Sequence, residues 1–117
     1  MATIEYGVSR IQTEKDPCHV ISWLGLATND DGQRLEMPGS ADRTVQVGGT
    51  FGGSTCIIEG SNDGVNYLVL TDPQGNNLSF TSAKIETVTE ITRYIRPRIT
   101  GGSGASINIH LLVRRNL

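Results

Sequence analysis

The stretch that decides the fold is residues 59–102, EGSNDGVNYLVLTDPQGNNLSFTSAKIETVTEITRYIRPRITGG, where short strand-like runs alternate with turn-forming residues. Asp63 and Gly64 separate a run ending at Ile58 from the run 65–70. An Asp-Gly pair readily supplies the positive φ angles of a tight hairpin. Residues 72–75, Asp-Pro-Gln-Gly, are a second turn signal, because Pro suits the second position of a turn and Gly tolerates left-handed geometry. The stretch therefore predicts β-hairpins.

Outward from this stretch, the sequence predicts about eight strands, with a spacing near ten residues that is typical of a sandwich or barrel. Seven are residues 20–24, 44–47, 55–59, 67–70, 78–81, 85–88 and 94–100. The eighth alternates strictly, with Ile107, Ile109, Leu111 and Val113 on one face and Ser106, Asn108, His110 and Arg114 on the other. This period is that of a half-buried antiparallel strand. The expected core comprises Val45, Val47, Ile58, Leu68, Leu70, Ile95, Ile99, Ile107, Ile109 and Leu111.

Two segments leave alternatives open. Residues 85–95 also fit a helical period, although five threonines between 81 and 100 favour a strand or an irregular connection. The glycines around Phe51 indicate either a flexible loop tip or bulges at a close backbone approach. The N-terminal third has fewer apolar residues, and we expect an arm over residues 1–17 and the β-sandwich domain over residues 18–117.

Composition narrows the function. The chain has 117 residues, enough for one compact domain, and a formal net charge of −2, so no general affinity for nucleic acid is expected. It has no apolar run long enough to span a bilayer, and residues 1–10 contain Glu5 and no apolar core of a signal peptide. We therefore expect a soluble protein made in the cytoplasm, with no membrane partner.

No catalytic or metal-binding motif stands out. Cys18 and Cys56 match no zinc spacing and are expected to be two separate core thiols, with a disulfide as the alternative. His19 and His110 belong to no metal or nucleophile signature, and the few aspartates lack the regular spacing of a calcium loop. We expect neither an enzyme nor a cofactor.

Charge is distributed unevenly. Of the ten basic residues, five follow residue 90, and no Asp or Glu does. On an extended segment Arg96 and Arg98 share a face with Tyr94, while Ile95, Pro97 and Ile99 point inward. One interpretation is a basic interface, because arginine is favoured in protein interfaces. A second is a solvated face whose arginines pair internally with Glu86 and Glu90. A third is nucleic-acid binding by the same patch, which the sparse aromatic residues and the acidic remainder of the chain disfavour. The candidate interface residues are Arg93, Tyr94, Arg96, Arg98, Arg114 and Arg115.

The motifs GSNDGVNY, LTDPQGNNLSFTS, RYIRPRITGG and INIHLLVRR, within residues 45–115, resemble the small β-sandwich cement or decoration proteins of tailed bacteriophages. The resemblance implies a jelly-roll-like sandwich on the outer surface of the virion, where it would bind the major capsid protein and bridge neighbouring capsomers. It implies no catalysis and no cofactor. We expect a homo-oligomer, a dimer or a trimer, because either could sit over a symmetry axis. The expected contact surfaces are the 93–98 strand, the C-terminal arginines and the N-terminal arm.

A second resemblance leads to a different function. Residues 61–64 followed by Arg-Tyr-Ile-Arg at 93–96 are similar to discoidin-like jelly rolls, which implies binding of carbohydrate or lipid head groups. The candidate aromatic platforms for such a ligand are Tyr6, Trp23, Tyr67 and Tyr94. On this alternative, replacing Trp23 or Tyr94 would abolish glycan binding.

Overall fold

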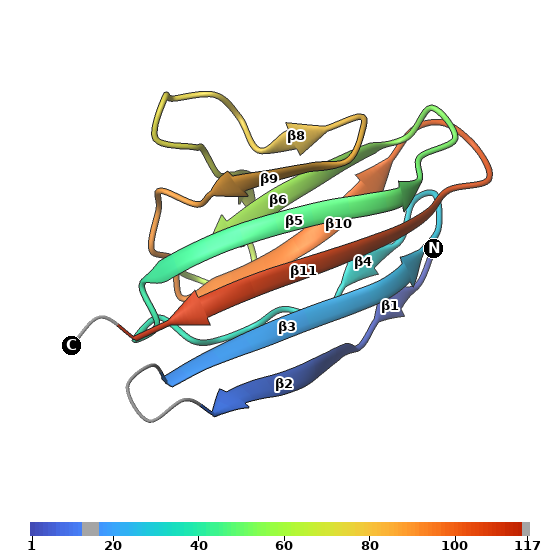
Figure 1. Ribbon diagram of the computed structural model, residues 1–117. Coiled ribbons are helices and arrows are strands. Elements are labelled where there is room, and N and C mark those ends of the chain that lie inside the picture. Colours follow the sequence, from blue (N-terminus) through green and yellow to red (C-terminus); the bar gives the residue numbers. More distant parts are fainter. Residues whose placement is uncertain (13–16, 116–117) are drawn as a thin grey trace.

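The computed structural model describes residues 1–12 and 17–115, which form a sandwich of two β-sheets (Figure 1). Its strands are β1 (Thr3–Ile4), β2 (Tyr6–Gln12), β3 (Pro17–Leu26), β4 (Asp31–Gly32), β5 (Asp42–Thr50), β6 (Thr55–Ser61), β7 (Leu68–Val69), β8 (Ser79–Phe80), β9 (Lys84–Thr87), β10 (Tyr94–Thr100) and β11 (Ser106–Arg114). The first sheet has the order β1-β4-β10-β6-β7, with β8 also paired to β6. The second has the order β2-β3-β11-β5-β9. Among the described residues, the strand pairs are antiparallel except β1 with β4, so the predicted all-β antiparallel sandwich is confirmed.

Each of the eight predicted strands coincides with an observed one, and the structure adds β1, β2 and β4. Two of the added strands, β1 and β2, lie within the predicted N-terminal arm. β2 pairs with β3 from Tyr6, opposite Trp23, to Gln12, opposite Pro17, and β1 pairs with β4 in the other sheet. Both segments are therefore sheet strands, because their backbone groups pair with neighbouring strands. Residues 13–16 of the predicted arm lie outside the described residues.

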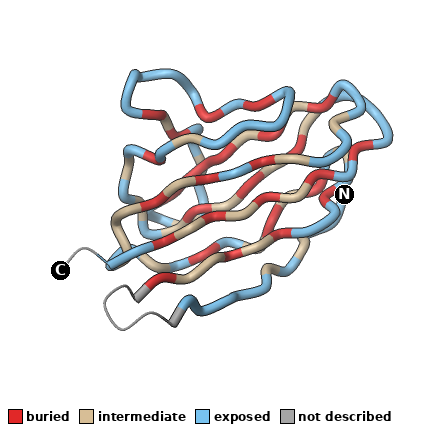
Figure 2. Tube along the Cα trace, viewed as in Figure 1, coloured by how far each residue is buried: buried red, intermediate tan, exposed pale blue. Residues whose placement is uncertain are grey.

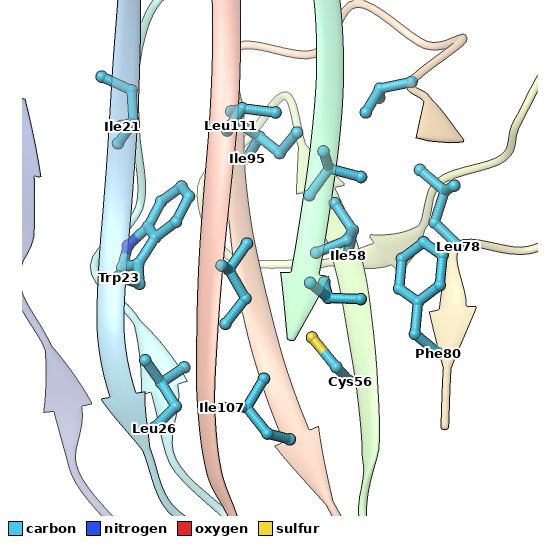
Figure 3. Packing of buried hydrophobic residues seen from close by; sticks show 14 of the residues in the cluster. Ile21, Trp23, Leu26, Cys56, Ile58, Leu78, Phe80, Ile95, Ile107 and Leu111 are labelled. Carbon is cyan, nitrogen blue, oxygen red and sulfur yellow. The ribbon is translucent and has the colours of Figure 1, made fainter. Parts of the chain in front are cut away.

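The core lies between the sheets, and β11 is at its centre. Alternate residues of β11 are buried from Ile107 to Val113, as the alternation predicts. Side chains from β3, β6, β10 and β11 meet in this layer (Figure 3). Trp23 is 1% exposed, and its Nε1 donates to the carbonyl oxygen of Gln33 at 2.9 Å. The partner matters because a buried indole N–H without an acceptor would be costly.

The Asp63-Gly64 hairpin exists, but its turn is not the predicted one. Strands β6 and β7 do pair, with Gly60 opposite Leu68, so the connection is a longer loop. Gly64 has a φ of 77°, whereas Asp63 has no positive φ. Asp63 Oδ1 instead accepts hydrogen bonds from Ser61 Oγ and from the backbone N–H groups of Val65 and Asn66, each at 2.8 Å. The carboxylate, not the backbone twist, organises this loop.

Of the other predictions for this region, two are confirmed and one is wrong. The Asp72 to Gly75 turn is confirmed, since the N–H of Gly75 donates to the carbonyl oxygen of Asp72 at 2.9 Å. The strand alternative for the segment after residue 84 is confirmed by β9, and the described part of residues 85–95 contains no helix. Leu68 is the one wrong member of the predicted core. It is 76% exposed because β7 is a two-residue strand at the edge of the first sheet.

Among the described residues, no helix is long and apolar enough to cross a membrane.

Candidate functional site: the arginine face of the first sheet

The predicted interface strand has the expected orientation. β10 buries Ile95, Pro97 and Ile99 and leaves the alternate residues partly exposed. Tyr94, Arg96 and Arg98 therefore share the outer face of the first sheet, on the side away from the core. We call this surface the arginine face and define it by Arg34, Tyr67, Arg93, Tyr94, Arg96 and Arg98.

A single buried carboxylate joins two of these arginines. Glu59 of β6 lies opposite Arg96 in the strand register and is only 3% exposed. Its Oε1 accepts from Arg96 Nε at 3.0 Å and lies 3.3 Å from Arg98 Nε. Arg96 also reaches Asp31 of β4, with 3.4 Å between Nη1 and Oδ2. Two positive and two negative side chains thus form one network across three adjacent strands.

Two tyrosine rings are covered by guanidinium groups. The guanidinium carbon of Arg96 lies 3.8 Å from the centroid of the Tyr67 ring. Arg34 and Arg93 lie 4.2 Å and 5.0 Å from the centroid of the Tyr94 ring. These distances are those of cation–π contacts. The contacts fix the planes of side chains that would otherwise be mobile.

Arg93 has its own counter-ion. Its Nε donates to Glu36 Oε2 at 2.6 Å, and this hydrogen bond, together with the charge on Glu36, raises the pKa of Arg93. The backbone N–H of Arg93 also donates to Asn62 Oδ1 at 2.9 Å. The side chain is therefore held on the surface in one direction.

Internal pairing of the arginines is observed, but the predicted partners were wrong. Glu86 pairs with Lys84 at 3.3 Å, and Glu90 accepts from the backbone N–H and the hydroxyl of Thr71. The acids that the arginines contact come from earlier in the chain and from neighbouring strands: Asp31, Glu36, Asp42 and Glu59. The arginines of the 93–98 segment therefore lie on a surface where acidic side chains compensate their charge.

The two C-terminal candidates do not join this surface. Arg114 ends β11 in the second sheet, where its Nη2 lies 2.9 Å from Oδ2 of Asp42, its register partner in β5. Arg115 follows β11 and is exposed. The candidate residues thus divide into the four of the 93–98 segment and a separate pair at the end of β11.

The face also contains residues that sequence reasoning did not assign to it, and none of them carries a local signal. The pairing of β10 with β4 and β6 brings Asp31 and Glu59 to the arginines. The bridge between Leu35 and Ile95 does the same for Arg34 and Glu36. The sequence predicts a role for Tyr67 only as a glycan platform. Of the other platforms, Trp23 is buried, and Tyr6 packs edge-on against it with ring centroids 5.9 Å apart.

Other chemistry in the described residues is sparse. No group of three or more His, Cys, Asp or Glu side chains in residues 1–12 and 17–115 is arranged to hold a metal ion. Cys18 and Cys56 are both free and buried, as expected, and do not form a disulfide. His110 Nδ1 lies 2.7 Å from Ser22 Oγ on the second sheet.

Comparison with known proteins places the fold. No protein-family model and no curated protein sequence matches the chain. Among solved structures, the chain is similar to the SPBc2 prophage-derived protein YomS, with 10% identity, a TM-score of 0.64 and coverage of 91% of this chain and 99% of that one. The cysteine peptidase Peruvianin-I from Thevetia peruviana latex aligns with 11% identity over 95% of this chain and 63% of that one, with a TM-score of 0.46. At these identities the likeness to YomS shows a shared sandwich fold.

Proposed function

We propose that the chain is a structural protein of a tailed bacteriophage, a cement or decoration protein that binds the major capsid protein on the outer surface of the virion. The observation that carries the proposal is the arginine face, where ion pairs and cation–π contacts hold arginine and tyrosine side chains on the outer surface of the first sheet. Tyr and Arg are the residue types that dominate binding energy in protein interfaces. The motif resemblance over residues 45–115 and the similarity in fold to a prophage-derived protein support the same reading.

The geometry suits docking to a rigid partner. Binding normally costs free energy to immobilise long side chains, about 0.5–1.5 kcal/mol for each. On the arginine face that cost falls, because Arg96 is already held by Glu59 and the Tyr67 ring. Arg93 and Arg98 keep 56% and 43% of their side-chain surface exposed, so each offers guanidinium N–H groups to acceptors on a partner. Many copies on a repeating capsid lattice would add avidity to weak single contacts.

The glycan-binding alternative receives no support from the geometry. Trp23 is inside the core, and the rings of Tyr67 and Tyr94 are stacked against arginines. A sugar would have to displace these guanidinium groups before it could stack on either ring.

Two measurements test the proposal. Mass spectrometry of purified virions of the encoding phage should find the protein at a fixed copy number relative to the major capsid protein. Purified protein should also co-sediment with expanded heads that lack it. The double variant Arg93→Ala/Arg98→Ala should lose this binding, while Lys84→Ala, which removes an exposed charge from the second sheet, should keep it. Absence from virions, or equal binding by both variants, would overturn the proposal.

A further inference from the structure

The edge strand β2 is built differently from the other sheet edges. In the described residues, β1, β7 and β8 at the margins of the first sheet are two residues long. β9, at one edge of the second sheet, has four residues and carries the Lys84–Glu86 ion pair. Short length and surface charge are the usual means by which proteins prevent edge-to-edge pairing.

β2 has less of both protections. It runs for seven residues, Tyr-Gly-Val-Ser-Arg-Ile-Gln, with no proline and a single charged side chain, Arg10. It pairs with β3 on one side only, because it is the last strand of the second sheet. The trace of β2, at the bottom of Figure 2, is exposed over nearly all of its length. Its outward backbone N–H and C=O groups form an open edge that can add a strand.

Val8 marks the centre of this edge. In the register Val8 lies opposite Ile21, which is fully buried, so both side chains point to the same side of the second sheet. Yet Val8 is 56% exposed. An apolar side chain that lies on the interior side of an edge strand and is still more than half exposed is the pattern expected where a second strand completes the sheet.

We infer that β2 is a homodimer interface, at which two copies pair their β2 strands antiparallel about a two-fold axis through Val8. In this register Val8 of one copy faces Val8 of the other, and Tyr6 faces Arg10 on the same side of the sheet. No like charges are opposed. A two-fold pairing is self-complementary, so a single strand provides both halves of the interface.

The dimer has one consequence for capsid binding, and this consequence rests on the proposed function. A two-fold axis perpendicular to the second sheet keeps equivalent faces on the same side of the joined sheet. Both arginine faces would then point in one direction, and the dimer could bind a capsid surface through two sites.

The test uses the purified protein alone, so its failure is distinct from a failure to bind capsids. Sedimentation velocity over a concentration series should show that the mass of the wild-type protein approaches twice the chain mass of 12.6 kDa. Val8→Lys places a charge on the open edge and should leave a folded monomer. The matched control Val65→Lys alters a valine that is 79% exposed on the loop after β6, and it should still dimerise.

A second variant keeps the test decisive if Val8→Lys does not fold. Val8→Cys should form an intermolecular disulfide under mild oxidation, because facing positions in an antiparallel pair bring the Cβ atoms to about 5 Å. Val65→Cys should not form this crosslink. A wild-type protein that stays monomeric at all concentrations, a dimer that persists in Val8→Lys, or equal crosslinking of the two cysteine variants would overturn the inference.

Discussion

Arg96 and Glu59 face each other across the β10–β6 register, and Glu59 Oε1 accepts from Arg96 Nε at 3.0 Å while the carboxylate is almost fully buried. The same carboxylate also contacts Arg98. Removing one partner of a buried ion pair is costly because it leaves charge without compensation. The arginine face is therefore part of the stability of the first sheet as well as a candidate docking surface.

Glu59→Gln tests that relationship. It should lower the free energy of unfolding by about 2–3 kcal/mol, below the range for fully buried pairs because Arg96 and Arg98 retain contact with water. Urea denaturation would report this as a lower midpoint with an unchanged slope. Glu36→Gln is the control: its pair with Arg93 is about half exposed on both sides, so the loss should not exceed about 1 kcal/mol. Equal losses would contradict the assignment of Glu59 as the buried centre.

Trp23→Phe removes the hydrogen bond to Gln33 and part of the packing against Tyr6. We expect a loss of about 2–4 kcal/mol, because the Gln33 carbonyl loses its donor and the smaller ring leaves a void. Trp23 is the single tryptophan of the chain, so fluorescence reports on it alone. The folded protein should emit at shorter wavelength than the unfolded protein and resist acrylamide quenching. Emission typical of a solvated indole would contradict the burial of Trp23.

The strands and the ion pairs differ in how much of them could be predicted from the sequence. Alternation alone locates β11, because a run such as Ile107 to Val113 has the period of a half-buried strand whatever it pairs with. The partner of Arg96 could not be predicted in this way. Glu59 is 37 positions away, and only the register of two strands brings the residues together. β1 and β4 could not be predicted for a related reason. Asp31–Gly32 has the composition of a turn, and both strands form only because β4 pairs with β1 and β10.

Cys56 should make stability depend on pH in alkaline solution. Burial raises the pKa of its thiol to about 12, whereas the pKa of an unfolded cysteine is about 8.5. The unfolded state therefore loses its proton first, so this contribution to stability is full below about pH 8.5 and is lost as pH rises towards 12. Denaturant midpoints should fall more steeply over this window in wild type than in Cys56→Ala. Parallel slopes would show that the folded thiol ionises normally.

Asp63 should remain ionised in acid. The backbone N–H groups of Asn66 and Val65, with the side chains of Asn66 and Ser61, hold the pKa of Asp63 well below its ordinary value. A depressed folded pKa means that this contribution to stability is present above the unfolded value, about 3.9, and is lost as pH falls through the folded pKa. Carboxyl NMR titration should place Asp63 well below an ordinary aspartate. Asp63→Ala should speed hydrogen exchange at the Val65 and Asn66 amides, which Val65→Ala should not.

Gly101 and Gly102 both have left-handed φ angles, of 72° and 67°. Comparing alanine substitutions at these two positions distinguishes the cost of backbone strain from the cost of a steric collision. A Cβ added at Gly101 would meet no atom within 4 Å, whereas one at Gly102 would lie 2.4 Å from the backbone nitrogen of Ser54. Gly101→Ala should therefore cost only the left-handed conformation, about 1–2 kcal/mol. Gly102→Ala must also displace the turn at residues 52–54, so we expect a loss above about 4 kcal/mol. Chemical denaturation of the two variants side by side measures the difference, and similar midpoints would mean that the turn moves freely away from Gly102.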